Sequence, residues 1–151
     1  MTLKLISPAF DHGGRIPDEH VRDGQNISPP LEWTGAPKGT RSFVLAVEDP
    51  DAPRGSFWHW AIYDLPGDRV MLHEGEEGAG YGLGVNDFGN RRYDGPQPPP
   101  GHGVHHYHFR LAALGTDHLD GLDNAPRAAA VWEQARKSAL AEAELVGTRQ
   151  A

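Results

Sequence analysis

The chain's 151 residues predict one domain, residues 1–151, and its formal net charge of −7 argues against nucleic acid as the main partner, because basic surfaces bind phosphate backbones. The absence of cysteine excludes disulfides and thiolate chemistry, and with an N-terminus too quickly interrupted for a signal peptide it predicts a cytoplasmic protein. No apolar run approaches the roughly 18 residues of a membrane helix, so stable membrane insertion is not expected.

Glycine and proline, with 19 and 13 residues, predict a turn-rich chain built mainly from strands. Residues 3–6 form the first short strand of this prediction. Residues 42–48 form a longer one, in which both faces are apolar. Phe43 and Val47 share one face and Val44 lies on the other, so we expect a central strand that is covered on both sides.

Two later segments also alternate with the period of a strand. In residues 57–65, strict alternation places His59 with Phe57 and Ala61 on one face, and Trp58 with Trp60 and Ile62 on the other. In residues 105–114, one face carries His105, Tyr107, Phe109, Leu111 and Ala113. The opposite face of that strand, with His106, His108 and Arg110, is expected to lie nearer solvent.

Residues 126–146 predict the one helix of the chain. Pro126 suits an early helical position, Asp123 or Asn124 could cap the helix, and Gly147 would end it. Strands followed by a terminal helix predict a mainly β protein, a β-sandwich with a peripheral helix.

Two clusters of polar and aromatic residues interrupt the apolar runs, in residues 47–63 and 95–109. If their strands are antiparallel neighbours, both clusters reach the same rim and form one anion-binding pocket. We expect Asp49 to stand beside His59, to orient its ring and to raise its pKa. His59, His105 and Tyr107 would then donate hydrogen bonds to an oxyanion.

Each of these residues also has a purely structural interpretation. Asp-Pro-Asp is a common turn composition, aromatic residues are usually core, and His106 and His108 fit a solvated strand face. A metal site built from Asp51, His59 and His105 lacks a closed set of four ligands at known spacing. We therefore predict neither a metal nor a cofactor.

The sequence offers no recognisable nucleophile, so we predict a binding protein rather than an enzyme. Residues 80–84 lack the lysine and the strand-to-helix context of a phosphate loop. No Gly-x-Ser-x-Gly elbow is present, and no motif supports Ser56. Two alternatives stay open: a hydrolase that uses an Asp49–His59 pair as general base, and an inhibitor of a kinase or protease that acts through protein contact.

Several motifs follow one another along nearly the whole chain. They are residues 26–33 (NISPPLEW), 42–43 (SF), 49–53 (DPDAP), 59–60 (HW), 84–89 (GVNDFG), 93–99 (YDGPQPP), 105–109 (HHYHF) and 141–148 (AEAELVGT). In this order they resemble the motifs of the phosphatidylethanolamine-binding proteins, in particular the bacterial Raf-kinase-inhibitor-like branch.

The resemblance implies a β-sandwich with a large central sheet, a smaller sheet and a C-terminal helix. It also implies a pocket for phosphate-like groups, including phospholipid headgroups and phosphorylated side chains, and a cis peptide at Ala52–Pro53. Carried over by motif, the residues of that pocket are Asp49, Asp51, Ala52, Pro53, Phe57, His59, Pro98, Gly103, His105 and Tyr107.

The chain departs from the family pattern at two positions. Gln97 stands where bacterial relatives often have cysteine, and Arg149 where an aromatic residue is common. We expect neither to touch the pocket. The C-terminus lacks the extension that helps to close the pocket in animal members, so kinase regulation does not follow from the resemblance. Some bacterial relatives pair as dimers, which leaves a homodimer open.

Overall fold

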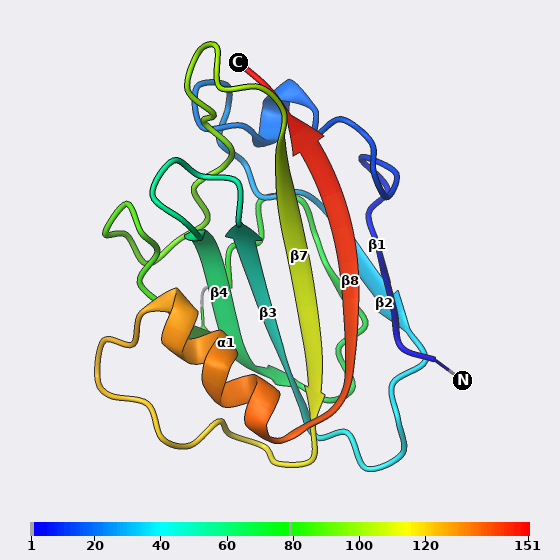
Figure 1. Ribbon diagram of the computed structural model, residues 1–151. Helices are drawn as coiled ribbons and strands as arrows, with labels where there is room; N and C mark the ends of the chain where they lie inside the picture. The colour runs from blue at the N-terminus through cyan, green and yellow to red at the C-terminus, as the bar shows by residue number, and fades with distance from the viewer. Residues whose placement is uncertain (1, 79) are drawn as a thin grey trace.

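The fold is built on a five-stranded antiparallel sheet, which a computed structural model describes for residues 2–78 and 80–151 (Figure 1). Its strand order is β6 (Gly82–Leu83), β4 (Phe57–Pro66), β3 (Ser42–Asp49), β7 (His105–Leu114) and β8 (Ala139–Arg149). A smaller antiparallel sheet has the order β1 (Lys4–Ile6), β2 (Leu31–Thr34) and β5 (Met71–Leu72). A short 3-10 helix (Asp18–His20) and the α-helix α1 (Ala128–Lys137) complete the elements. The prediction of a mainly β protein with two sheets and one α-helix near the C-terminus is confirmed.

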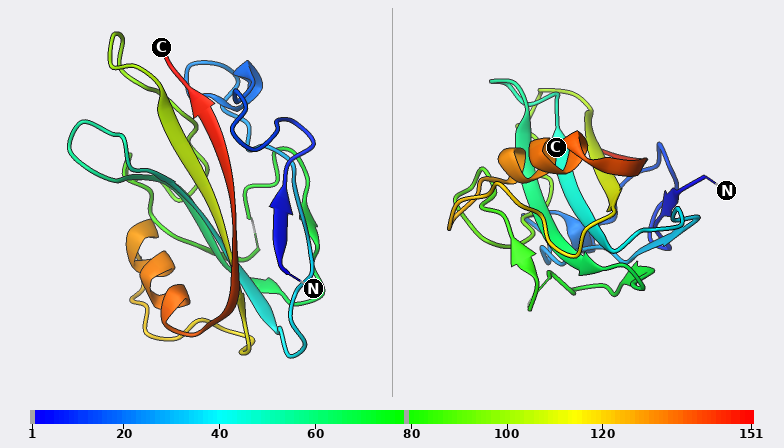
Figure 2. Two further views of the ribbon diagram at one scale, coloured as in Figure 1. Left: turned by 45° about the vertical axis from the view of Figure 1, so that its right-hand side comes forward. Right: turned by 90° about the horizontal axis from the view of Figure 1, so that it is seen from below.

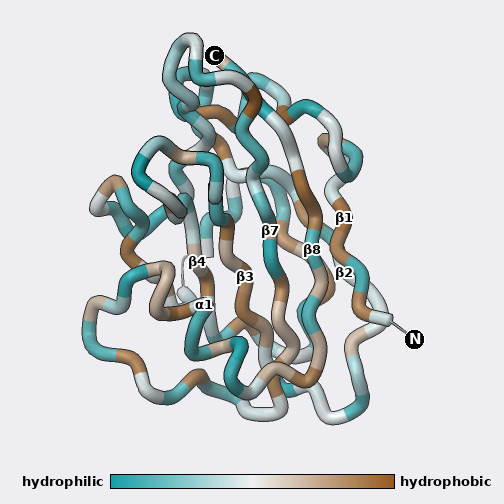
Figure 3. The backbone as a smooth tube through the Cα atoms, in the orientation of Figure 1, coloured by the Kyte–Doolittle hydropathy of each residue, from teal (hydrophilic) through white to brown (hydrophobic). Residues whose placement is uncertain are grey.

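The large sheet is covered on both faces, by the small sheet and by α1 (Figure 2). β3 lies in its middle, as predicted. Phe43, Leu45 and Val47 pack in the core shared with the small sheet, whereas Val44 and Ala46 pack against α1. All five are essentially inaccessible to solvent, and Figure 3 shows hydrophobic residues concentrated along this strand. Burial on both faces explains why β3 has no polar face.

A β-bulge in β4 makes the predicted alternation of that strand wrong. Val47 pairs with Trp60 and the next residue, Glu48, pairs with Trp58, so β4 carries one extra residue, His59. Trp60 and Ile62 consequently face the core under the small sheet, while Trp58 packs on the helix side with Ala61. A bulge leaves two successive residues on the same side of the sheet, which is how His59 and Trp60 both avoid the helix.

The predicted helix over residues 126–146 is wrong in its second half. α1 ends at Lys137, and residues 139–149 form β8, which pairs with nearly the whole length of β7. Within β8, half-buried and exposed positions alternate from Ala139 to Glu144, the period of a strand, and Leu145 is buried. Pairing along β7 thus outweighs the helical propensity of the alanines and glutamates.

The predicted helix ends are also wrong. Arg127 occupies the N-cap position without a side-chain hydrogen bond, and Ser138 is the C-cap. Asp123 accepts from the backbone N–H of Ala125 instead, and Gly147 lies inside β8. Within residues 2–78 and 80–151, α1 is the longest helix and falls well short of the length and apolar character needed to span a membrane.

Candidate functional site

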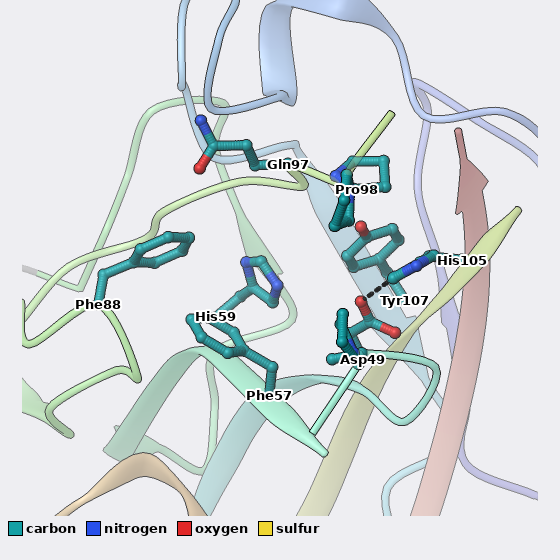
Figure 4. Close-up of a pocket in the computed structure, with 11 residues that line it drawn as sticks. Asp49, Phe57, His59, Phe88, Gln97, Pro98, His105 and Tyr107 are labelled. Atoms are coloured by element: carbon teal, nitrogen blue, oxygen red, sulfur yellow. Dashed lines mark hydrogen bonds and ion pairs between the residues drawn. The ribbon is translucent and has the colours of Figure 1, made fainter. Parts of the chain in front are cut away.

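A cavity of about 160 Å³ lies at one end of the large sheet, where β3 ends and β4 and β7 begin (Figure 4). The antiparallel order of these strands brings their ends together, and the loop that precedes β7 closes the remaining side. The residues that line it are Asp49, Ala52, Pro53, Phe57, His59, Phe88, Gln97, Pro98, Pro99, His105 and Tyr107. Residues 49–59 and 97–107, two segments far apart in the sequence, therefore contribute to one cavity together with Phe88.

Eight of the ten residues expected at the site line this cavity, and Asp51 and Gly103 do not. The Asp51 carboxylate accepts hydrogen bonds from the backbone N–H and from Nδ1 of His106, both at 2.8 Å, and so joins its loop to the outer face of β7. Gly103 is exposed and has a φ of +89°, a conformation that glycine adopts without strain. The Ala52–Pro53 peptide expected to be cis is trans, as are all peptide bonds of the described residues.

Three aromatic rings enclose the His59 side chain. Its ring centroid lies 5.0 Å from that of Phe57, 5.3 Å from Tyr107 and 5.6 Å from Phe88. Figure 4 shows the imidazole between Phe57 and Phe88, facing the space in front of Tyr107. The side chain is almost fully buried, so its ring is held by packing as well as by hydrogen bonding.

The expected Asp49–His59 pair is wrong. His59 Nδ1 donates to the backbone carbonyl of Asp94 at 2.7 Å, and a carbonyl can only accept. The pKa of His59 is lowered, because burial penalises the charged imidazolium more than the neighbouring carbonyl and Asp49 favour it. We expected this pKa to be raised; the ring is instead neutral at pH 7.

Asp49 pairs with His105, as the dashed line in Figure 4 marks. Oδ2 of Asp49 lies 2.6 Å from Nδ1 of His105, and Oδ1 accepts the backbone N–H of Asp51 at 2.8 Å. The other nitrogen of His105, Nε2, lies 2.5 Å from Nδ1 of His102. A chain of hydrogen bonds thus runs from Asp49 through His105 to the loop that closes the cavity.

The Tyr107 side chain supplies a hydroxyl group at the cavity. Burial, and then the negative charge of Asp49, raise the pKa of Tyr107, so the phenol keeps its proton at physiological pH. Tyr107 is 1% exposed and lies beside both His59 and His105. It can therefore donate a hydrogen bond to an acceptor in the cavity.

A polar cluster behind His59 was not predicted from the sequence. The buried Asp94 carboxylate accepts hydrogen bonds from the side-chain amides of Asn26, Asn86 and Asn90, at 2.8 to 3.0 Å. Asn26 has a φ of 56° and also accepts the backbone N–H of Gly95 at 2.7 Å. These contacts fix the carbonyl that holds His59. Asn26, Asn86 and Asp94 lie within the motifs quoted above, but no motif states which residues meet.

Gln97 lines the cavity, which corrects the expectation that it would not touch the pocket. Its side chain accepts from Arg22 at 2.9 Å and donates to Asp23 at 2.7 Å. The Arg22 guanidinium also lies 3.9 Å above the centroid of Phe88, a cation–π contact. Arg22 therefore connects two lining residues that the sequence analysis missed at this site, Gln97 and Phe88.

The hypothetical metal set of Asp51, His59 and His105 does not converge. Asp51 is engaged by His106, outside the cavity, while His59 and His105 are held by Asp94 and Asp49. In the part of the chain that the structure describes, no three histidine or carboxylate side chains are placed so that they could hold a metal ion.

Comparisons with known proteins match almost the full length of this chain. The family described as phosphatidylethanolamine-binding protein matches residues 6–150. A UPF0098 protein of Aquifex aeolicus is 40% identical over 149 residues, which cover 96% of this chain and 86% of that protein. The UPF0098 protein YbhB of Escherichia coli is 40% identical over 158 residues, 95% of this chain and 97% of its own.

Solved structures show the same fold. Escherichia coli YbcL, described as a new member of the mammalian PEBP family, matches with a TM-score of 0.93 and 30% identity and covers 100% of this chain and 99% of its own. A phosphatidylethanolamine-binding protein homolog from Chlamydia trachomatis matches with a TM-score of 0.88 and 33% identity, over 99% and 98% of the two chains.

Proposed function

We propose, from the premise that this chain belongs to the phosphatidylethanolamine-binding protein family, that its cavity binds a small phosphorylated or other anionic group. In this proposal the protein is a binding module and not an enzyme. The observation that carries it is the convergence of His59, His105 and Tyr107 on one cavity. These three side chains come from two strands. The His59 ring is oriented by Asp94, outside the cavity, and the His105 ring by Asp49, in its lining.

The size of the cavity supports a small ligand. An engineered protein cavity of about 150 Å³ accepts a benzene molecule, and the cavity here has about 160 Å³. A phosphate group with a short substituent fits this space. Phe57, Phe88 and the prolines of the loop would cover the carbon part of the ligand, while Tyr107 donates to an oxygen.

The proposal predicts that inorganic phosphate and phosphoethanolamine shift the imidazole NMR signals of His59 and His105 in a saturable way. The exposed His118, which lies outside the cavity, is the internal control and should not shift. Replacing Tyr107 by phenylalanine removes one donor to a charged oxygen, so we expect roughly tenfold weaker binding of phosphate. Unchanged His59 and His105 signals at millimolar ligand would contradict the proposal.

One observation favours a hydrolase as the second candidate. A general base needs a free ring nitrogen. In His59, Nδ1 is occupied by its hydrogen bond to the Asp94 carbonyl, which leaves Nε2 for the cavity. A screen of phosphomonoesters and carboxylic esters tests this role. Turnover that His59→Gln abolishes, and that His118→Gln leaves intact, would establish the enzyme and displace the binding module.

A further inference from the structure

The His59 ring carries its proton on the nitrogen that faces away from the cavity. The Asp94 carbonyl oxygen lies 2.7 Å from Nδ1 of His59 and can only accept, so Nδ1 carries the proton. A neutral imidazole has one ring proton, which leaves Nε2 with a lone pair. Within the described residues the His59 ring makes one hydrogen bond, through Nδ1, and the backbone carbonyl of Gly95 also lies near the ring. His59 therefore presents an acceptor to the cavity and not a donor.

The neighbouring ionisable groups cannot replace the missing donor. Both carboxylate oxygens of Asp49 are occupied, by the backbone N–H of Asp51 and by His105. Both ring nitrogens of His105 are engaged, by Asp49 and by His102. The Tyr107 hydroxyl is a donor, but a bare oxyanion would still place its lone pairs against the lone pair of His59 Nε2.

We propose that the cavity selects an oxyanion that brings its own acidic proton, a phosphomonoester in its singly charged form, and that this proton is shared with Nε2 of His59. A phosphodiester, the linkage of a phospholipid headgroup, has no such proton and binds more weakly. This inference rests on the proposed binding of anions and adds which class of phosphate is preferred. Burial lowers the pKa of His59, so at neutral pH the ring does not readily take up a second proton from solvent and offer it to the ligand.

The selection couples binding to proton uptake. A phosphomonoester has a second pKa of about 6, so at pH 7.5 most of it is dianionic and nearly one proton must be taken up on binding. At pH 5 the ligand already carries that proton and uptake should be close to zero. The groups that face His59 are the charged Asp49 and Asp94 and the hydroxyl of Tyr107, and the His105–His102 pair lies next to them.

The test is calorimetric titration at pH 5 and pH 7.5 in buffers with different enthalpies of ionisation. Phosphoethanolamine and glycerophosphoethanolamine carry the same amine and differ in being a monoester and a diester. We expect proton uptake for the monoester at pH 7.5 only, and roughly tenfold to a hundredfold weaker binding of the diester at that pH. Equal affinity for the two, with no uptake of protons, overturns the inference.

The variant His59→Gln places an amide N–H where the lone pair was. It should bind the monoester with little proton uptake and should bring the two affinities to about the same value. The matched control His118→Gln, at an exposed histidine, should behave as the parent protein. Uptake that persists in His59→Gln would assign the proton to His102 and His105 and would overturn the inference.

Nitrogen-15 NMR of the parent protein gives the same answer without a variant. In the protein without ligand, the nitrogen-15 chemical shifts of His59 should be those of a protonated Nδ1 and an unprotonated Nε2. Adding phosphoethanolamine should move the Nε2 chemical shift towards that of a protonated nitrogen. A free His59 that is already protonated at Nε2 overturns the inference. If neither ester binds at all, the proposed function fails; if both bind alike, only this selection fails.

Discussion

Replacing Asp94 by asparagine should lower the free energy of unfolding by about 3 kcal/mol, because a buried carboxylate that accepts several hydrogen bonds is lost. The new amide would direct N–H groups at the amides of Asn86 and Asn90, which now donate to that carboxylate. Urea unfolding measures the loss. Asp68→Asn, the same change at an exposed aspartate, is the control and should stay within about 0.5 kcal/mol.

The effect of Asp94→Asn should depend on pH. Burial opposes ionisation of Asp94, but the three amide donors and the Arg92 guanidinium outweigh it, so the pKa of this carboxyl lies below its usual value. A group with a lowered folded pKa stabilises the protein above its unfolded pKa, near 4, and this contribution is lost as the pH falls through the folded pKa. The difference between parent and variant should be constant from pH 7 to pH 5 and shrink below about pH 4. A difference that persists unchanged in acid would contradict the assignment.

The second large effect is expected for Gly95→Ala. A Cβ atom at residue 95 would lie 2.0 Å from the carbonyl oxygen of His20 and 3.0 Å from Cα of Val21, both backbone atoms that cannot swing away. The loop would have to separate from the segment against which it packs, where Arg22 N–H donates to the carbonyl of Pro96 at 3.0 Å. We expect a loss of about 3 kcal/mol, the upper end of what overpacking costs, together with loss of phosphate binding.

Gly101→Ala is the matched control for Gly95→Ala. It lies in the same loop, and a Cβ atom there would meet nothing within 4 Å. Its φ of +76° makes alanine unfavourable by about 1 kcal/mol through backbone strain alone. Thermal and urea unfolding separate the two. Similar losses of stability in both variants would contradict the prediction, because they would show that the close contact between residue 95 and His20 is not the reason for glycine at position 95.

Periodicity predicted the elements in which it is strict. β3 and β7 alternate regularly, and their predicted faces agree with the two cores. β4 was misread at Trp58 because a one-residue bulge reverses the alternation, and the bulge forms only through pairing with β3. The sequence predicts helix in place of β8 because alanine and glutamate favour helices locally, while the hydrogen bonds that make it a strand come from β7.

The location of the candidate site could be predicted from the sequence, but its hydrogen-bond partners could not. Polar residues at the ends of β3, β4 and β7 predicted that two clusters would meet, and the cavity lies there. The pairing of Asp49 with His105, and of His59 with Asp94, depends on backbone positions fixed by segments far away in the sequence. The same holds for Arg22 and Gln97, which are 75 residues apart.

The alternating side chains of β3 belong to two separate hydrophobic clusters, one on the side of the cavity and one under α1. Val44 and Ala46 belong to the cluster under α1 with Val131 and Ala135, and none of these four lines the cavity. Substitutions there can change how firmly the helix is held while the chemistry on the other face stays as it is. Over many generations, resistance to heat and choice of ligand can thus diverge independently, because the side chains responsible for each lie on opposite faces of the same strand.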